Sequence, residues 1–348
     1  MDLLTTPAAA ARGTLSVVVP VYNEDVVLPA FQQRLRAVLD VLECDVEIIY
    51  VNDGSTDESL TALTEIHRSD PRVAVIDLSR NFGKEVAMTA GLDAAAGDAV
   101  IMMDADLQDP PECIPDMVRE WQAGCDVVLM RRRSRVQDGW FKKATARAFY
   151  RAIGRIGAID IPPNVGDFRL LSRRATQALR RFPERSRFMK GLFAWIGFPT
   201  REIEYDRDGR FAGKTKWNYW RLWNFALEGI TSFSAVPLKL ASYIGLATSL
   251  VAFVYGGYVV VKTLLIGDRV PGYPTLVTLV LFLGGLQLMA LGIIGEYLAR
   301  MFVEVKQRPL YLVQRHLPPG HPLSPPSAQP LDLTAPCPTE RIERTHSQ

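Results

Sequence analysis

Residues 99–112 read AVIMMDADLQDPPE, and this stretch decides the fold class. A short apolar run is followed at once by an acidic segment that contains Asp104 and Asp106. Apolar runs of this length, bounded by turn residues, are typical of buried strands. In open α/β sheets, ligands bind at the carboxyl ends of such strands. We therefore expect the surrounding sequence to contain further strands that end in polar residues.

Strands and helices are expected to alternate through residues 14–130. The apolar runs predict strands at residues 15–21, 46–51, 73–78, 99–103 and 126–130, with helices at residues 25–42, 56–67, 84–96 and 115–123. This alternation predicts an α/β domain with a mostly parallel, doubly wound sheet. Two further strands end in polar segments, PVYNE at residues 20–24 and VNDGSTD at residues 51–57. Neither is a dinucleotide-binding glycine motif or a P-loop, which argues against those two classes of site.

The acidic pair Asp104 and Asp106 predicts a divalent cation site. Side chains two residues apart in an extended chain point the same way, and two adjacent carboxylates repel unless a cation lies between them. Gln108 adds a further oxygen. Oxygen ligands with open coordination positions suit Mg²⁺ or Mn²⁺ that holds a diphosphate. An isolated D-x-D pair is more often a solvated turn, but here two other polar strand ends accompany it.

The net charge of +2 hides two opposed blocks. Residues 13–130 carry 7 basic and 22 acidic side chains, whereas residues 131–221 carry 23 basic and 8 acidic ones. Such asymmetry suggests an acidic part that holds metal and a basic part that meets anionic ligands or a membrane. With 48% hydrophobic residues, the composition excludes disorder, collagen and coiled coil for the bulk of the chain.

Two long uncharged stretches predict a transmembrane hairpin within residues 240–305. Residues 240–261 and 270–295 carry no charge, and each is long enough to cross a hydrocarbon core about 30 Å thick. We place the spans at about residues 240–262 and 274–298, with buried core helices as the alternative. Residues 1–12 are expected to be a tail. Residues 306–348 are expected to be a cytosolic tail that is disordered from about residue 316, because residues 316–348 contain eight prolines.

The basic block contains a predicted interfacial helix near residues 139–157. Lys143, Arg147, Arg151 and Arg155 recur every four residues opposite an apolar face, which is typical of a helix lying in a membrane interface. A second juxtamembrane helix is expected at residues 222–239. The basic residues 131–133 also permit a nucleic-acid reading. The hairpin that follows argues against it, so we expect no nucleic acid partner.

Together these motifs resemble family 2 glycosyltransferases. The similarity is greatest to the polyprenyl-phosphate glycosyltransferases, the group that includes bactoprenol glucosyltransferases and dolichyl-phosphate mannose synthases. It covers residues 13–312 and is carried by DADLQDPPE at 104–112, SRNFGK at 79–84, GDFR at 166–169 and RFAGKTKW at 210–217. The resemblance implies a Rossmann-like catalytic domain of the GT-A fold over residues 13–221, followed by the membrane hairpin.

The resemblance also implies roles for individual residues. The implied metal ligands are Asp104, Asp106 and Gln108, and the implied nucleotide-sugar ligands are Pro20, Tyr22, Glu24, Asp53, Lys84, Asp104, Arg210 and Lys216. Chemically, Tyr22 suits stacking on a base, whereas Glu24 and Asp53 suit hydrogen bonds to a base or ribose. Arg210 and Lys216 lie in a segment whose family pattern is R-x-x-G-x-S-K-Y, in which this chain has Thr215 and Trp217. These two cations suit closure over the phosphates, with a solvated basic loop as the alternative.

Asp167 and Asp106 are the expected catalytic residues. In related inverting transferases an aspartate like Asp167 takes a proton from the acceptor. A phosphate acceptor is largely ionised at pH 7, so orientation of the acceptor or of the sugar is an equal alternative. The structural alternative for Asp167 is an ion pair with Arg169. The candidates for binding the acceptor phosphate are Arg132, Lys143 and Arg147.

The expected function is an inverting, Mg²⁺- or Mn²⁺-dependent transfer of a sugar onto a polyprenyl phosphate. Glucose from UDP-glucose and undecaprenyl phosphate are the first choices, for modification of cell-envelope glycans; mannose, aminoarabinose and N-acetylhexosamine remain open. A processive polysaccharide synthase, which would carry a Q-x-x-R-W motif absent here, and a non-catalytic membrane scaffold are the alternatives. The charge bias places the catalytic domain and both termini in the cytosol at a bacterial inner membrane. Paired glycines in the hairpin suggest a homo-oligomer.

Overall fold

A computed structural model describes residues 13–133, 165–185, 187, 189–206, 236–266 and 272–320. The described chain forms two units, an α/β domain and a helical hairpin, and each is described by itself. In the domain, eight strands form one sheet in the order β7-β5-β6-β4-β1-β2-β3-β8. The strands are β1 (Thr14–Val21), β2 (Asp45–Asn52), β3 (Val73–Leu78), β4 (Ala99–Met102), β5 (Val127–Arg132), β6 (Val165–Ser172), β7 (Thr200–Tyr205) and β8 (Val313–Leu317).

The strand pairing makes the sheet mostly parallel, as the alternating pattern predicts. β1 pairs in parallel with β2 and β4, and β2 pairs in parallel with β3. β6 is antiparallel to both of its neighbours, β4 and β5, while β5 and β7 run in parallel. The antiparallel strand β6 therefore lies between β4 and β5, which are predicted to follow one another directly.

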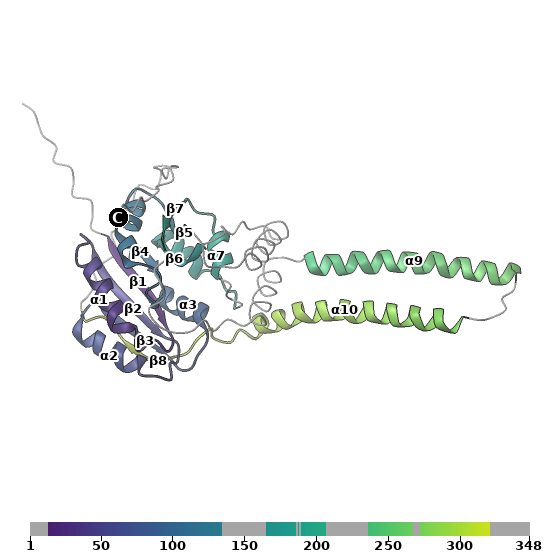
Figure 1. The fold of residues 1–348 in the computed structure, drawn as a ribbon, viewed down its shortest axis with the longest axis horizontal. Helices are drawn as coiled ribbons and strands as arrows, with labels where there is room; N and C mark the ends of the chain where they lie inside the picture. The colour runs from purple at the N-terminus through teal and green to yellow at the C-terminus, as the bar shows by residue number, and fades with distance from the viewer. Residues whose placement is uncertain are drawn as a thin grey trace, which may run out of the picture. The chain divides into compact units, whose positions relative to one another are not determined.

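Helices cover both faces of this sheet (Figure 1). The described helices of the domain are α1 (Leu28–Leu39), α2 (Ser59–Ser69), α3 (Lys84–Ala94), the short 3-10 helix η1 (Pro111–Cys113), α4 (Ile114–Gln122), α6 (Arg173–Arg180) and α7 (Met189–Trp195). α1 contacts α2 and η1, while α3 contacts β1, β2 and α6. Each parallel crossover is thus made through a helix, as βαβ topology requires.

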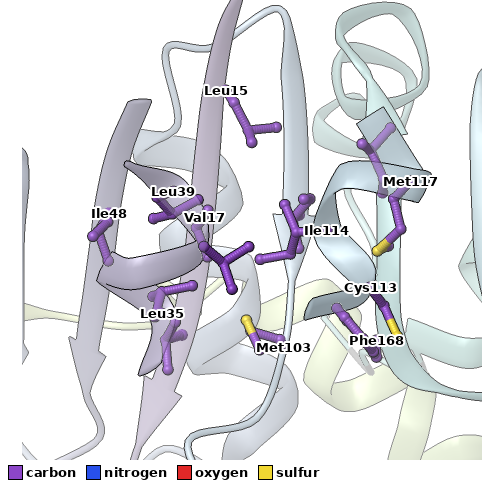
Figure 2. Close-up of a cluster of buried hydrophobic side chains, with 14 of the residues drawn as sticks. Leu15, Val17, Leu35, Leu39, Ile48, Met103, Cys113, Ile114, Met117 and Phe168 are labelled. Carbon is purple, nitrogen blue, oxygen red and sulfur yellow. The ribbon is translucent and has the colours of Figure 1, made fainter. Parts of the chain in front are cut away.

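The buried core follows the two-residue period of the strands. Leu15, Val17 and Val19 of β1 are fully buried and join the cluster that includes α1 and α4 (Figure 2). Val18 points to the opposite face, where α3 lies so close that a Cβ added at Gly91 would meet a Val18 methyl carbon at 2.2 Å. A glycine is needed there to let the helix approach the sheet.

The observed elements match the sequence predictions closely up to residue 130. The main difference lies at residues 103–110, where β4 ends at Met102 and the chain enters turns. Asp104 and Asp106 therefore do not extend the strand, and the expectation of an extended pair is wrong. Leu107 adopts a left-handed backbone with φ 58°, which is unusual for a residue with a side chain, and it bends this acidic loop (residues 103–110) directly after Asp106.

The predicted C-terminal tail also needs correction. Val313–Leu317 forms β8, which pairs antiparallel with β3 at one edge of the sheet. The order continues to Gly320, whose amide donates to the carbonyl of Pro71 at 2.9 Å. Disorder from about residue 316 is therefore wrong for residues 316–320. Composition alone missed this strand because its stability depends on pairing with β3 rather than on its own burial.

The hairpin consists of α9 (Val236–Ile266) and α10 (Tyr273–Lys306), which contact one another. Both are long and apolar enough to cross a membrane, over Leu240–Tyr258 and Phe282–Lys306. Both are longer than predicted, and α9 takes up the end of the predicted 222–239 helix. With 34 residues α10 is about 51 Å long, well beyond the roughly 30 Å hydrocarbon core. Its last turns carry Glu296, Arg300, Glu304 and Lys306.

Candidate active site

The polar strand ends meet at one edge of the sheet. In the parallel registers, Val21 of β1 lies beside Asn52 of β2, and Asn52 lies beside Asp77 of β3. β4 and β6 pair Met102 with Arg169, so the chain that follows Met102, which includes Asp104, leaves the sheet at the end of β6 where Asp167 lies. Two predicted site residues that are 63 positions apart in the chain are thus brought together by the sheet.

The end of β1 is tied to the end of β2 by a set of loop hydrogen bonds. Asn23 has a left-handed backbone with φ 54°; its amide donates to Ser55 Oγ at 3.0 Å, and its Oδ1 accepts from the Thr56 amide at 2.8 Å. Its neighbour Tyr22 has 39% of its surface exposed, while Pro20 is partly buried. The amide of Glu24 donates to Ser59 Oγ at 2.9 Å. The loop is therefore held firmly, and Tyr22 keeps part of its surface exposed, as stacking on a base requires.

Asp53 has an internal role in the structure. It is only 2% exposed, and its two carboxylate oxygens accept from the amides of Phe82 and Gly83 at 2.7 and 2.9 Å. Burial raises the pKa of Asp53, and this outweighs the two amide hydrogen bonds and the charge of Arg80, which lower it. Asp53 thus fixes the turn that precedes Lys84; its predicted contact with a nucleotide stays a prediction.

The acidic loop offers oxygen ligands for a cation, but its side chains alone do not form a complete coordination shell. Oδ1 of Asp106 accepts from the amide of Gln108 at 3.1 Å, and the Gln108 side chain is buried. Within the described residues, no three His, Cys, Asp or Glu side chains gather as a metal site. Two carboxylates and one amide oxygen are hard ligands, which fit Mg²⁺ or Mn²⁺ if a diphosphate and water complete the shell. The residues present therefore fit a cation that is shared with substrate.

Lys84 links this loop to Asp167. Its ammonium nitrogen lies 2.6 Å from Oδ1 of Asp104 and 2.6 Å from Oδ2 of Asp167. The alternative ion pair between Asp167 and Arg169 is not formed; Arg169 instead donates to the Gly166 carbonyl at 2.7 Å and stacks on Phe193. The other Asp167 oxygen, Oδ1, is buried with no hydrogen-bond partner. Asp104 of the acidic loop and Asp167 therefore both pair with the ammonium group of Lys84.

Glu85 follows Lys84, and its position in the sequence predicts no role in the site. Its carboxylate accepts from the amide of Met189 at 3.2 Å. Burial and the nearby charge of Asp167 raise the pKa of Glu85 to about 7, although Lys84 and Lys190 oppose the shift. A raised pKa beside a predicted catalytic residue is a signal that only the folded geometry provides.

The three arginines at residues 131–133 face different partners. Arg131 pairs with Glu202 at 2.9 Å, and Arg133 lies 3.8 Å from Glu204. Arg132 alone turns to the opposite face, where its Nε donates to Tyr205 Oη at 3.3 Å. Of the predicted acceptor-side residues only Arg132 lies within the described chain. Lys143, Arg147, Arg210 and Lys216 lie outside it, as does the predicted helix at 139–157.

Comparison with known proteins identifies the family of the chain. Residues 16–180 match the model of glycosyl transferase family 2, and residues 236–301 match that of the GtrB C-terminal hairpin. An uncharacterised glycosyltransferase of Synechocystis sp. is 52% identical over 299 residues, which is 86% of this chain and 94% of the relative. A prophage bactoprenol glucosyl transferase homolog of Escherichia coli is 47% identical, with 86% of this chain and 98% of the relative covered. The bactoprenol glucosyl transferase of Shigella phage SfII is also 47% identical, with coverage of 86% and 97%.

These relatives cover both the domain and the hairpin, and their identity is far above what fold similarity alone would give. The mostly parallel sheet and the acidic loop at its carboxyl edge match the GT-A architecture that the motifs imply. A purely structural scaffold is thereby set aside. The chain belongs to glycosyl transferase family 2, and it is a membrane-associated glycosyltransferase.

Proposed function

We propose that the protein transfers glucose from UDP-glucose to undecaprenyl phosphate with inversion at the sugar carbon. The single observation that carries the proposal is the shared Lys84 contact, which brings the acidic loop of Asp104 to within one side chain of Asp167. A donor diphosphate at that loop would place its sugar next to Asp167. The bactoprenol glucosyl transferases among the relatives support glucose and the polyprenyl carrier.

In the proposed reaction a phosphate oxygen of the lipid forms a bond to C1 of glucose while the bond from C1 to the UDP oxygen breaks. UDP leaves with the electron pair. No proton has to be removed, because a phosphate monoester is largely ionised at neutral pH. Asp167 is held as a carboxylate by Lys84, so it suits orientation of the sugar or stabilisation of the positive charge that develops on it.

The leaving diphosphate needs positive charge. Asp104, Asp106 and Gln108 would hold Mg²⁺ or Mn²⁺, which neutralises that leaving group when bound. The remaining donor contacts are proposed for Pro20, Tyr22, Glu24 and Asp53 at the ends of β1 and β2, and for Lys84, Arg210 and Lys216 near the phosphates. Arg132, Lys143 and Arg147 are proposed for the acceptor phosphate. The catalytic domain and both termini are proposed to lie in the cytosol, where nucleotide sugars are made.

The test is an assay of the purified full-length protein in detergent with undecaprenyl phosphate and a panel of radiolabelled nucleotide sugars. We expect lipid-linked product with UDP-glucose and added Mg²⁺ or Mn²⁺. Product with a mannose, aminoarabinose or N-acetylhexosamine donor instead would keep the reaction class and change the sugar. Absence of lipid-linked product with every donor would overturn the proposal, and Asp106→Ala provides the inactive control.

A further inference from the structure

Arg132 and Tyr205 are neighbours across two parallel strands. They are directly paired in the register of β5 and β7, and Arg132 Nε donates to the Tyr205 hydroxyl at 3.3 Å. The Tyr205 ring is 4% exposed and packs edge-on against Phe168, with ring centroids 6.0 Å apart. The buried ring holds the Tyr205 hydroxyl in place, and this hydroxyl in turn positions the Arg132 guanidinium through its Nε.

Tyr205 is itself held by Asp109, which lies near the end of the acidic loop. The hydroxyl donates to Oδ1 of Asp109 at 2.5 Å, and Asp109 is 1% exposed. Burial and the adjacent Asp109 carboxylate raise the pKa of Tyr205, so the hydroxyl stays protonated and keeps donating. One hydroxyl therefore connects the acidic loop that carries Asp104 to the guanidinium on β5.

The guanidinium lies against β6 at Gly166, and the charge of Asp104 on the acidic loop acts on it. A Cβ added at Gly166, the residue before Asp167, would lie 3.0 Å from Nη2 of Arg132. Arg131 forms an ion pair with Glu202 of β7. Arg133 forms ion pairs with Glu204 of β7 and with Asp206, which follows this strand. Within the described chain, the two terminal nitrogens of Arg132 have no hydrogen-bond partner. An arginine held by Nε presents those nitrogens as a two-pronged donor, the arrangement that matches phosphate oxygens.

We propose that Tyr205 and Asp109 form a positioning pair that aims the Arg132 guanidinium at a phosphate beside Asp167. The inference rests on the proposed function, and it assigns the phosphate to the lipid acceptor. The diphosphate of the donor would bind a guanidinium in the same way as the phosphate of the lipid acceptor. The experiment below distinguishes these two ligands. Tyr205 and Asp109 touch no substrate in this scheme; they act through Arg132.

The test compares Tyr205→Phe with the wild-type protein. The variant removes only the hydroxyl and keeps the ring against Phe168. Loss of a hydrogen bond to a charged group should raise the KM for undecaprenyl phosphate about tenfold, while kcat and the KM for UDP-glucose change about twofold at most. Asp109→Asn should act in the same direction but more weakly, because an amide oxygen still accepts from the hydroxyl. Tyr50→Phe is the matched control, because the buried hydroxyl of Tyr50 on β2 donates to Oε1 of Gln32 on α1 at 2.6 Å.

A double variant shows whether Tyr205 acts through Arg132. In an Arg132→Ala background, Tyr205→Phe should cause no further change in the acceptor KM. Additive effects, or equal effects of Tyr205→Phe and Tyr50→Phe, would overturn the inference. A selective rise in the KM for UDP-glucose would support the pair and assign the phosphate to the donor.

A second readout needs no turnover. Undecaprenyl phosphate should raise the melting temperature of the wild type and of Tyr50→Phe in detergent, and it should raise that of Tyr205→Phe clearly less. If the wild type makes no lipid-linked sugar but this difference persists, the proposed function fails while the positioning pair stands. If product forms and the difference is absent in both assays, the positioning pair fails alone.

Discussion

The ammonium nitrogen of Lys84 lies 2.6 Å from Oδ2 of Asp167, and this contact crosses from the start of α3 to β6. The Asp167 side chain is 12% exposed, whereas that of Lys84 is 41% exposed. Burial alone would raise the pKa of Asp167, but the charges of Lys84 and Lys190 outweigh it and hold the pKa well below its usual range. Lys84 and Lys190 therefore favour the ionised form of this buried carboxylate.

Lys84→Ala should abolish most of the sugar transfer. The substitution leaves two carboxylates, Asp104 and Asp167, facing one another without the cation between them. We expect kcat to fall by roughly 100-fold or more, the scale of losing one preorganised electrostatic contact. Arg36→Ala, which removes an exposed cation 3.7 Å from Asp40, is the charge-matched control and should keep full activity. Lys84→Ala activity within about twofold of wild type would show that the contact is incidental.

Removal of divalent metal should stop the reaction through the acidic loop. Treatment with a chelator is expected to eliminate product formation, and added Mn²⁺ should restore it. Asp106→Ala should not be restored, because the loop then keeps one carboxylate. Binding of Mn²⁺ followed by electron paramagnetic resonance gives a readout apart from turnover, in which the variant should bind more weakly. Full activity of the chelated protein would rule out a metal on this loop.

The sequence was sufficient for the parallel half of the domain, because its buried strands are apolar runs with polar ends. Residues 73–78 match β3 at both ends, and β1 and β2 are extended by only a residue or so at their ends. The polar strand ends also met at one edge, as parallel topology requires. In β1, β2 and β3 the local pattern of apolar residues agrees with the position of each strand in the sheet, so these strands could be predicted from the sequence.

Residues that depend on antiparallel or distant pairing were harder to predict. β6 lies between β4 and β5, and only that placement puts Asp167 next to Asp104. Tyr205 and Asp109 are 96 positions apart, and neither carries a local signal for its hydrogen bond. Long-range register is set by packing of the whole sheet rather than by any window of sequence.

Glu85 predicts a pH dependence of stability. Its pKa is raised to about 7 in the folded protein, from a usual value of 4.5, through burial and the charge of Asp167. A carboxyl that is easier to protonate when folded stabilises the fold below about pH 4.5 and loses that effect as pH rises through about 7. Glu85→Gln should therefore raise the melting temperature at pH 8 relative to wild type, by about 2–4 °C for each kcal/mol. The amide oxygen of glutamine can still accept from the Met189 amide.

The same comparison at pH 5 provides the internal control for Glu85. Wild type and Glu85→Gln should melt at nearly the same temperature there, since the carboxyl is then mostly protonated in the folded state. The groups that set the shift are Asp167, Lys84 and Lys190. An identical difference between the two proteins at pH 5 and pH 8 would mean that Glu85 does not titrate in this range.

Strand β8 follows α10 in the chain and forms one edge of the sheet. Truncation after Leu312 removes β8 but keeps the hydrogen bond from the Ser79 amide to the Leu312 carbonyl, whereas truncation after Gly320 keeps the whole strand. Most β8 side chains are exposed, so its contribution comes from backbone pairing and from covering the edge of β3. We expect the shorter chain to be less stable by about 2–3 kcal/mol and to melt about 5–10 °C lower in detergent. The chain that ends at Gly320 should match the full-length protein. Both truncations leave α9 and α10 complete, so membrane insertion serves as the common control, and equal melting temperatures for the two would show that β8 does not stabilise the domain.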